Sequence, residues 1–586
     1  MRRVLALAAL VGLFVTSSGT ATPSAPSTAS STAIGKGGAA ATVDRLATEA
    51  AIDVLRDGGN AVDATVAAAG VLGVTEPFSC GIGGGGFMVV YDGHGQHHGE
   101  VTTIDHRETA PFAMHPQSFW EGGRPLPFND ARFSGLSVGV PGTVRGWTEA
   151  LQRYGTISLA SALAPAIRIA RNGFTVDQTF FDQTQQNVDF FDDVPATAAL
   201  FLDPDGTPHD VGTTFRNPEL ARTYELLAER GADAFYGGDL AGAIVRTVRE
   251  PQIAPTANHV WRPGVMATGD LASYRAPLRP PTHVTYRGLD VFSMGPPSSG
   301  GSTVGEALNI LEGYPLSSMT REHALHYYLE ASRFAFADRN AYLADPDYFE
   351  VPLSGLLSKS FAAERRSLIG ETAATSPVAP GDPYPHQVGE ASATSTRVGT
   401  TTHLTVSDRK GNVVSYTFTI ESTGGAGLVV PGYGFLLNNE LTDFNFDSTT
   451  HPNRVEGGKR PRSSMSPTII TRRGKPVLAL GSPGGSTIIT TVLQMLVDRI
   501  DLGSTMPEAL ANPRASQRNT TTTSAEPAFI SSTEAGALVA RGHRFASTPE
   551  IGAATALEFL HGNRVLAAAE PVRRGGGTAL VVRPKP

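Results

Sequence analysis

Apolar residues recur at helical spacing in two neighbouring stretches near the start of the chain. Residues 42–57 carry them on one face and stop at Gly58 and Gly59, where a helix typically ends. Asn60 can cap a second helix over 61–74, which is apolar on nearly every face and is therefore expected to be buried. The same spacing predicts later helices at 143–153, 160–172, 218–230 and 323–343.

The pattern changes to strands after residue 400. Residues 413–420 alternate between apolar and polar side chains, and residues 428–430 and 476–482 read as short strands. An amphipathic helix follows at 486–500. Helices followed by strands indicate a layered α/β arrangement.

A glycine-rich loop at 81–86 fits G-x-G-x-x-G, the pattern of dinucleotide-binding loops. That pattern requires a strand before the loop and a helix after it, whereas here a helix precedes and a strand follows. We therefore interpret the loop as a turn that allows close backbone packing. Cys80, just before it, is the single cysteine and is interpreted as a buried structural thiol rather than a nucleophile.

Residues 401–419 predict a hairpin closed by the three-residue turn 409–411, with Gly411 in the left-handed position. Counting back from the turn places Thr401 opposite Thr419, close enough for their hydroxyls to hydrogen-bond. One face of this hairpin is apolar. The other face carries hydroxyls and one imidazole, from Thr401, His403, Thr405, Ser415, Thr417 and Thr419, with Glu421 beyond them. A solvent-facing, threonine-rich strand would give the same pattern and remains the alternative.

Thr401 is distinguished by the segment that precedes it. Residues 372–396 contain four prolines and few periodic apolar residues, which predicts an exposed linker. If the chain were cut before Thr401, the new terminus would carry a hydroxyl nucleophile and an α-amino base of pKa ~7.7–8.0 in one residue. Such a site needs no further base, which fits the lack of a G-x-S-x-G elbow in the sequence.

Composition indicates a globular, exported protein. The chain has 586 residues, of which 40% are hydrophobic and 17% charged. Arg2 and Arg3 precede a short apolar run and then small polar residues, which predicts a signal peptide within residues 1–28, and the run is too short to span a bilayer. No later run is long enough, so no membrane span is expected in the mature chain. The formal charge of −8, without a long basic cluster, disfavours nucleic acid as a partner.

Several motifs in order resemble the γ-glutamyltranspeptidase (γ-glutamyltransferase) family of N-terminal-nucleophile hydrolases. They are T-T-H-L-T-V-S-D, N-N-E-L-T-D-F, K-R-P-R-S-S-M-S-P-T and G-S-P-G-G-S, preceded by G-G-N-A-V-D-A, D-H-R-E-T-A-P and V-G-V-P-G-T-V-R-G. The resemblance implies an αββα sandwich and a precursor that cuts itself between Thr400 and Thr401. It implies a large subunit of residues 29–400 and a small subunit of residues 401–586, which stay together as a heterodimer.

The resemblance also assigns roles within a site for γ-glutamyl amides such as glutathione or glutamine. Thr401 would be the nucleophile and Thr419 its hydrogen-bond partner; Arg107, Ser463 and Ser464 would bind the α-carboxylate; Glu440, Asp443 and Glu421 would bind the α-ammonium end; Gly484 and Gly485 would donate N–H groups to the oxyanion. A guanidinium fork suits a carboxylate, and a strand-to-helix turn presents free N–H groups. The alternatives are a surface ion pair for Arg107, a helix cap for the serines and an ordinary turn for the glycines.

Two departures from the family pattern bear on the substrate. Only 20 steps separate Asp443 from Ser463 (463 − 443), as in family members without a lid loop, which implies an open site that accepts bulky substrates, including poly-γ-glutamate. The acidic pair Glu440 and Asp443 is present, which favours a γ-glutamyl substrate over the alternative, a cephalosporin or glutaryl acylase of the same fold. An inactive secreted binding protein is the third alternative. No cofactor is implied, and no His, Asp or Glu cluster has metal-ligand spacing.

Overall fold

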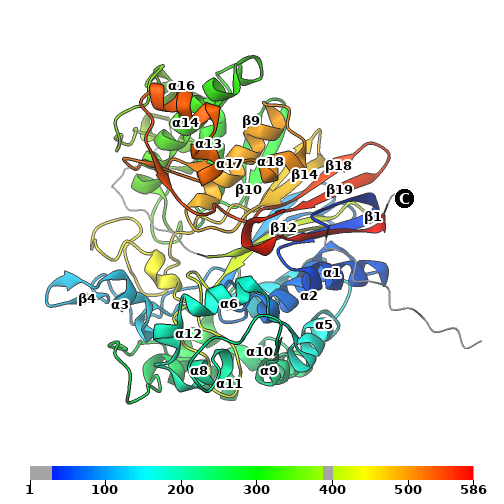
Figure 1. Cartoon of the computed structure of the whole chain (residues 1–586), viewed down its shortest axis with the longest axis vertical. Coiled ribbons are helices and arrows are strands. Elements are labelled where there is room, and N and C mark those ends of the chain that lie inside the picture. Colours follow the sequence, from blue (N-terminus) through cyan, green and yellow to red (C-terminus); the bar gives the residue numbers. More distant parts are fainter. Residues whose placement is uncertain (1–29, 387–399, 585–586) are drawn as a thin grey trace, which may run out of the picture.

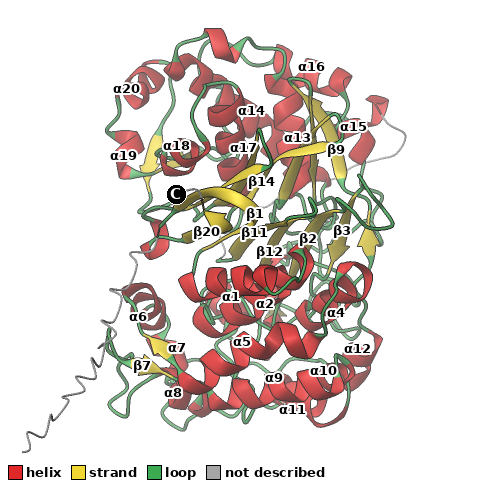
Figure 2. Ribbon diagram, turned by 90° about the vertical axis from the view of Figure 1, so that its right-hand side faces the viewer, coloured by secondary structure: helices red, strands yellow, loops and turns green. Residues whose placement is uncertain are grey.

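The computed structural model describes residues 30–386 and 400–584. The signal peptide predicted within 1–28, and residues 387–396 of the predicted linker, lie outside the described residues. The described chain is arranged in four layers, with strands in a central band between helices on either side (Figures 1 and 2). Among the described residues, no helix is both long and apolar enough to cross a membrane.

Within the described residues, thirteen strands form one antiparallel sheet in the order β8-β3-β2-β12-β11-β1-β19-β18-β14-β13-β10-β9, with β20 also paired to β1. The strands are β1 Thr32–Thr42, β2 Gly85–Tyr91, β3 Val101–Asp105, β8 Leu278–Arg279, β9 Thr282–Tyr286, β10 Leu289–Ser293, β11 Thr402–Asp408, β12 Val413–Thr419, β13 Thr468–Arg472, β14 Lys475–Gly481, β18 Thr555–Leu560, β19 Arg564–Ala569 and β20 Thr578–Pro584.

The sheet curls so that its two halves pack face to face. Strands β11 and β12 contact β14 and β18 across the interior, and small side chains such as Ala39, Ala479 and Ala567 fill the space between the halves together with Val89 and Leu557. Small residues allow the close approach that two packed sheet layers need. The predicted αββα sandwich is confirmed, with its two sheets continuous through β1 and β19.

Helices cover the outer surface of each half (Figure 2). One half carries α1 Arg45–Arg56, α2 Ala61–Thr75, α4 Thr143–Tyr154, α5 Leu159–Asn172, α9 Pro218–Arg230 and α11 Gly238–Arg249; the other carries α13 Gly300–Leu311, α14 Arg321–Tyr342 and α17 Thr487–Ile500. Shorter helices at the periphery include α6 Gln178–Gln185, α8 Pro195–Phe201, α12 Thr268–Ser273, α16 Lys359–Ser367, α18 Met506–Ala511 and α20 Thr533–Ala540.

The first two predicted helices are confirmed. Asp44 caps α1 through the N–H of Ala47, and Asn60 forms a capping box with Asp63 at the start of α2. Every residue of α2 is buried, as its uniformly apolar sequence predicts.

Strand β1 was not predicted, although it lies between β11 and β19 near the middle of the sheet. Its sequence, T-A-I-G-K-G-G-A-A-A-T, is rich in glycine and alanine, which disfavour strands on their own. The structure shows why glycine is needed: a Cβ at Gly35 would lie 2.1 Å from the carbonyl oxygen of Arg583, and Gly38 has φ +115°. Tertiary packing therefore overrides the local preference.

The glycine-rich loop before β2 packs as predicted. A Cβ at Gly84 would lie 1.9 Å from the carbonyl oxygen of Thr419, so this backbone approaches β12 as closely as only glycine permits. Cys80 is buried, and burial raises the pKa of its thiol well above the ordinary value. Both observations support the structural interpretation of this segment.

Candidate active site

The hairpin of β11 and β12 has the predicted register. His403 pairs with Thr417 and Thr405 with Ser415, and the turn contains Gly411 at φ +92°. Every residue of both strands is buried, so the solvent-facing alternative is wrong. The hydroxyl face lies against the other half of the sheet, where Thr405 contacts Thr555.

His403 is a structural member of that face. One ring nitrogen lies 2.7 Å from the Thr417 hydroxyl, and the ring packs directly on Gly481. Burial lowers the pKa of His403 to about 3, so the imidazole stays neutral near pH 7. The side chain is therefore unsuited to hold or transfer a proton at that pH.

The peptide bond between Thr400 and Thr401 lies at the entrance of the hairpin, and the Thr419 hydroxyl contacts both sides of it. Thr419 Oγ1 donates to the Thr400 carbonyl oxygen at 2.6 Å and lies 3.4 Å from Thr401 Oγ1, which donates to it. The N–H of Glu421 donates to Thr419 Oγ1 at 2.8 Å and fixes its orientation. The predicted nucleophile therefore lies next to the carbonyl that it would attack during self-cleavage.

The turn after β12 holds this geometry in place. Glu421 has φ +78°, a left-handed conformation that a residue with a Cβ rarely adopts. Its carbonyl accepts the N–H of Thr400 at 2.6 Å, and its side chain contacts Ser422 and Asn439. Strained backbone conformations of this kind persist where surrounding contacts enforce them, often at functional sites.

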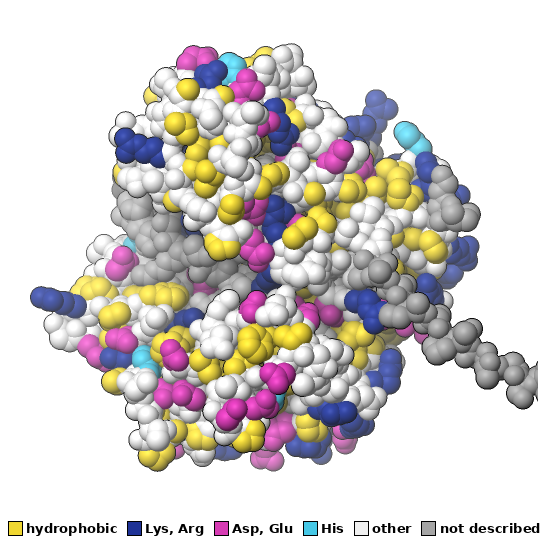
Figure 3. Space-filling model, viewed as in Figure 1, with side chains coloured by type: hydrophobic (Ala, Val, Ile, Leu, Met, Phe, Trp, Pro, Cys, Tyr) yellow, Lys and Arg dark blue, Asp and Glu magenta, His cyan; other side chains and the backbone are white. Residues whose placement is uncertain are grey.

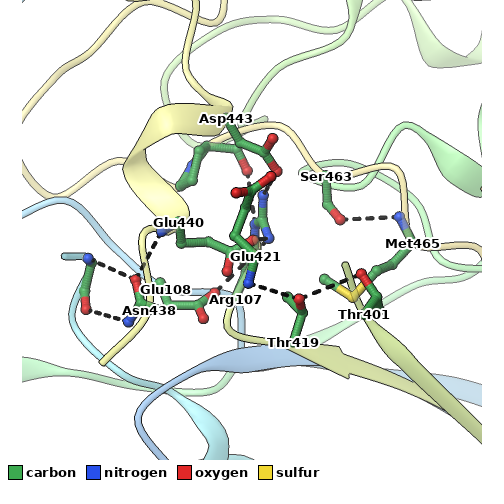
Figure 4. Close-up of polar contacts among 12 residues, drawn as sticks. Arg107, Glu108, Thr401, Thr419, Glu421, Asn438, Glu440, Asp443, Ser463 and Met465 are labelled. Atoms are coloured by element: carbon green, nitrogen blue, oxygen red, sulfur yellow. Dashed lines mark hydrogen bonds and ion pairs between the residues drawn. The ribbon is translucent and has the colours of Figure 1, made fainter. Parts of the chain in front are cut away.

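Arg107, just after β3, is fully buried and binds two carboxylates (Figure 4). Its guanidinium contacts Glu440 and lies 2.5 Å from Asp443, and its Nε donates to the carbonyl of Pro461 at 3.1 Å. Glu440 and Asp443 lie three residues apart in a 3₁₀ turn, which places both side chains on one side. The surface ion pair considered for Arg107 is wrong, because the pair is buried.

Burial governs the charges of this cluster. It raises the pKa of Glu440 well above the ordinary value and that of Glu108 to about 8, although Arg107 opposes both shifts. Burial and the neighbouring Asp443 raise the pKa of Glu421 to about 7. Asp443 is the accessible carboxylate, with 27% of its side chain exposed against 1% for Glu440.

The predicted residues converge on one pocket. It is lined by Arg107, Arg339, Thr401, Thr419, Glu421, Glu440, Thr442, Asp443, Phe444, Arg462, Ser463, Ser464, Met465, Gly485, Ser486 and Ile488. Gly484, with φ +129°, lies in the turn before α17 but outside this lining. Thr400 is also outside the lining, on the other side of the bond to Thr401.

The two serines lie in an extended segment rather than at a helix start. Ser463 is bridged to Ser298 and accepts the N–H of Met465 at 3.0 Å, and Ser464 accepts from Arg339 at 2.7 Å. The helix-cap alternative for Ser463 and Ser464 is therefore wrong. Burial lowers the pKa of Arg339 well below its ordinary value. The sequence prediction did not include Arg339 or Arg462, although Arg462 stands within the motif K-R-P-R-S-S-M-S-P-T, directly before Ser463.

A second set of contacts, also not predicted, holds Thr401 from the opposite side. Arg574 donates to the Thr401 carbonyl at 2.7 Å and to the Ser79 hydroxyl at 2.8 Å, and Ser79 donates to Glu76 at 3.2 Å. Burial raises the pKa of Glu76 to about 7, against the opposing charge of Arg574. The only sequence signal here is the run R-R-G-G-G, which indicates an unusual backbone; Arg574 itself has φ +55°.

A four-layer αββα sandwich with a threonine hydroxyl at the start of a central strand is the arrangement of N-terminal-nucleophile hydrolases. A sequence model described as Gamma-glutamyltranspeptidase matches residues 47–580. The chain belongs to the gamma-glutamyltranspeptidase family. Among the described residues, no group of three or more His, Cys, Asp or Glu side chains is arranged to hold a metal ion.

The relatives carry names that refer to two activities, and each of them aligns with this chain over most of its length. A glutathione hydrolase proenzyme of Bacillus subtilis is 39% identical over 90% of this chain and 89% of its own. An acylase proenzyme, ACY 1, of a Pseudomonas strain is 35% identical over 93% of this chain and 95% of its own. The crystal structure of a cephalosporin acylase from Bacillus halodurans superposes with a TM-score of 0.81 at 29% identity, covering 95% of this chain and 98% of that one.

Proposed function

We propose that the chain is an exported proenzyme that cuts itself before Thr401 and then acts as a γ-glutamyl hydrolase and transpeptidase. The observation that carries this proposal is the contact of one hydroxyl, Thr419 Oγ1, with both Thr401 Oγ1 and the Thr400 carbonyl. A hydrogen bond to that carbonyl polarises it, and the 3.4 Å contact positions the attacking hydroxyl. The family relationship supports the same reaction.

Self-cleavage would proceed as an N-to-O acyl shift. Thr401 Oγ1 attacks the carbonyl carbon of Thr400 and gives up its hydroxyl proton. Collapse of the adduct then breaks the C–N bond, and the departing amine of Thr401 takes up that proton. The resulting ester joins the Thr400 carbonyl to Thr401 Oγ1. Water hydrolyses this ester and leaves two chains, 29–400 and 401–586, held together by the β1–β11 and β12–β2 pairings.

In the cut enzyme, the free α-amine of Thr401 is the general base, with an ordinary pKa of ~7.7–8.0. It accepts the hydroxyl proton as Thr401 Oγ1 attacks the γ-carbonyl of the substrate, and it returns a proton to the leaving amine. A γ-glutamyl ester remains on the enzyme. Attack by water completes hydrolysis, whereas attack by an amino acid or peptide amine completes transpeptidation.

The charged cluster would bind the amino-acid end of the substrate. Arg107 lies on the pocket wall and is paired with Glu440 and Asp443. The α-carboxylate of the substrate would replace Asp443 on the guanidinium, which would free Asp443 for the ammonium. The hydroxyls of Ser463 and Ser464 extend that subsite. Asp443, the accessible carboxylate, would bind the ammonium with Glu421, and Gly484 and Gly485 would donate to the oxyanion.

The natural substrates proposed are glutathione, glutamine and other γ-glutamyl amides, including poly-γ-glutamate. The relative from Bacillus subtilis is named a glutathione hydrolase, which supports the smaller substrates. The short connection from Asp443 to Ser463 supports an open site for the larger one. Export through the N-terminal signal would place the enzyme outside the cytoplasm.

An acylase is the second candidate, because the relatives include an acylase proenzyme and a cephalosporin acylase. Glutaryl and γ-glutamyl groups differ only in the α-amine. Asp443 and Glu421 are the groups that would recognise this amine, and their presence in the pocket favours the γ-glutamyl substrate.

The test compares the wild type with Thr401→Val and with Thr402→Val. The Thr402 hydroxyl has no hydrogen-bond partner within the described residues, so its loss is a matched control. We expect two bands on a denaturing gel and release of p-nitroaniline from γ-glutamyl-p-nitroanilide for the wild type and Thr402→Val. For Thr401→Val we expect one uncut band and no release.

An uncut but active wild type would contradict the proposed nucleophile. Glutaryl-p-nitroanilide serves as the second substrate because it lacks only the α-amine. Faster release from the glutaryl compound than from the γ-glutamyl compound would select the acylase instead.

A further inference from the structure

A second cleft lies at the opposite end of the β11–β12 hairpin from Thr401. Its volume is about 1100 Å³. Four connections surround it: the bulge in β1, the turns β11–β12 and β13–β14, and the turn β18–β19, with the end of α17 beside them. We refer to it as the distal cleft. Strand β11 separates it from Thr401 by seven residues, or ~23 Å at ~3.3 Å per residue.

The distal cleft is strongly basic in a chain whose net charge is negative. Its lining includes Lys36, Arg409, Lys410, Arg472, Lys475, Arg499 and Arg564, against two acidic residues, Asp408 and Glu558. Figure 3 shows Lys and Arg side chains gathered on the right-hand edge, where Figure 1 places the tips of β18 and β19. The local charge is therefore opposite in sign to the formal −8 of the whole chain.

The acidic residues of the lining are already engaged. Glu558 lies 2.5 Å from Arg499, and the two side chains form an ion pair at this lining. Asp408 accepts N–H groups of Ala61 and Lys410 and the side-chain amide of Asn412, so it closes the turn. The remaining six basic side chains have no carboxylate partner in the described chain.

These cations have no evident structural role. Lys36, Arg409, Lys410, Arg472 and Lys475 are exposed, and they come from three separate connections that meet at the cleft. Unpaired charges of one sign that line the same cleft reinforce one another's potential, so they attract an anion more strongly than an isolated cation does. Convergence from separate segments is typical of a binding surface.

The apolar residues of the lining indicate which class of anion the cleft binds. Four half-buried apolar residues of the lining, Val477, Ile500, Phe559 and Leu560, form what we call the floor, and the exposed basic residues form the rim. An acidic polypeptide offers carboxylates on methylene stems, which match a basic rim above an apolar floor. A phosphate polymer would leave the apolar floor uncovered.

We propose that the distal cleft binds an extended acidic polypeptide chain, at a site separate from the pocket of Thr401. Binding there requires neither self-cleavage nor turnover, so the proposal is independent of the proposed function. In a secreted hydrolase of γ-glutamyl bonds, such a site would retain the enzyme on a polyglutamate-like polymer.

The test measures binding of fluorescein-labelled, α-linked oligoglutamate to the full-length protein by fluorescence anisotropy. The α-linkage keeps the probe from being a γ-glutamyl substrate. We expect saturable binding that weakens at high salt and is weakened at least about tenfold by Arg472→Gln/Lys475→Gln. The matched control is Arg222→Gln/Arg230→Gln on α9, which removes the same charge from another exposed surface. Activity on γ-glutamyl-p-nitroanilide should be unchanged in both pairs.

Three results would overturn the proposal. One is the absence of saturable binding to the wild type. Another is equal weakening by the control pair, which would attribute the binding to overall charge. The third is binding of inorganic polyphosphate without binding of oligoglutamate, which would exclude an acidic polypeptide as the occupant.

Discussion

The two ends of the β11–β12 hairpin differ in whether their charged side chains are buried and paired or exposed and unpaired within the described residues. At the Thr401 end, Arg107 is buried and held by Glu440 and Asp443. At the turn end, Arg409 and Lys410 are exposed and lack carboxylate partners in the described chain. The same pair of strands thus connects a small pocket with fixed, paired charges to a wide cleft with free ones.

This difference follows from burial. A buried charge must be paired and hydrogen-bonded, so Arg107 and Glu440 are held in fixed positions within the pocket. An exposed charge keeps its hydration and needs no partner. We therefore expect substitutions at the pocket end to change chemistry and stability strongly, and substitutions at the cleft end to change only the binding of a polyanion.

The largest effect is expected from Thr419→Val, which keeps the side-chain shape and removes the hydroxyl that contacts the Thr400 carbonyl. Loss of one such donor should slow self-cleavage by roughly 10²- to 10³-fold. A time course of the purified precursor on a denaturing gel measures the rate. Thr417→Val, on the same face, is the control and should be cut at a rate close to wild type. Equal rates of self-cleavage for the wild type and both variants would show that the Thr419 hydroxyl does not contribute to self-cleavage.

Asp443→Asn should raise KM for γ-glutamyl-p-nitroanilide by about 10- to 100-fold, because a charged hydrogen bond to the substrate ammonium contributes ~1.5–3 kcal/mol. The cluster keeps the contact between Arg107 and Glu440, so the fold should persist. Asp447→Asn is the control, since Asp447 is exposed four residues further on. Equal KM values for the two variants would reject the role of Asp443.

Glu421 gives the pocket end a pH dependence. Its pKa is raised from 4.5 to about 7, so the folded chain keeps a proton that the unfolded chain releases. Its contribution to the free energy of unfolding therefore falls as pH rises from about 4.5 to 7, by about 3 kcal/mol in total.

The Glu421→Gln substitution should remove this pH-dependent loss in the free energy of unfolding. In the uncut Thr401→Val background, denaturant unfolding should show the Glu421→Gln chain gaining stability relative to its parent between pH 5 and pH 8. The exposed Glu229→Gln should show no such gain. A pH-independent difference for Glu421→Gln would mean that Glu421 is ionised throughout.

The smallest effect is expected at the cleft end. Arg472→Gln/Lys475→Gln should change the free energy of unfolding by no more than about 0.5 kcal/mol, because both side chains are exposed. Denaturant unfolding checks this value. A loss of several kcal/mol would show that these cations stabilise the fold, which would end the contrast between the two ends.

The first two helices and the hairpin register could be predicted from local periodicity, caps and turn chemistry, whereas the sandwich was implied by the resemblance to the family. Strand β1 could not be predicted, since its glycines are required by contacts with Arg583 and Ser407 that lie far away in the chain. The solvent-facing alternative for the hairpin failed for a similar reason. Periodicity separates two faces but does not reveal that a second sheet layer covers the polar one.

The candidate site likewise contains residues that could be predicted from the sequence and residues that could not. Residues within motifs, such as Arg107, Glu440 and Asp443, could be named in advance, and the structure brings them to one pocket. Arg574 could not, because it reaches Thr401 from the C-terminal segment through tertiary packing alone. The charges of the distal cleft were also missed, because they come from separate turns and form no run in the sequence.

The most direct test of the central claim is N-terminal sequencing of the smaller chain of the purified wild-type protein. The three consecutive threonines make the readout specific. Cleavage between Thr400 and Thr401 predicts the start Thr-Thr-His-Leu. A start of Thr-Thr-Thr-His, of Thr-His-Leu, or a single uncut chain would contradict Thr401 as the residue that cuts the chain and then attacks the substrate.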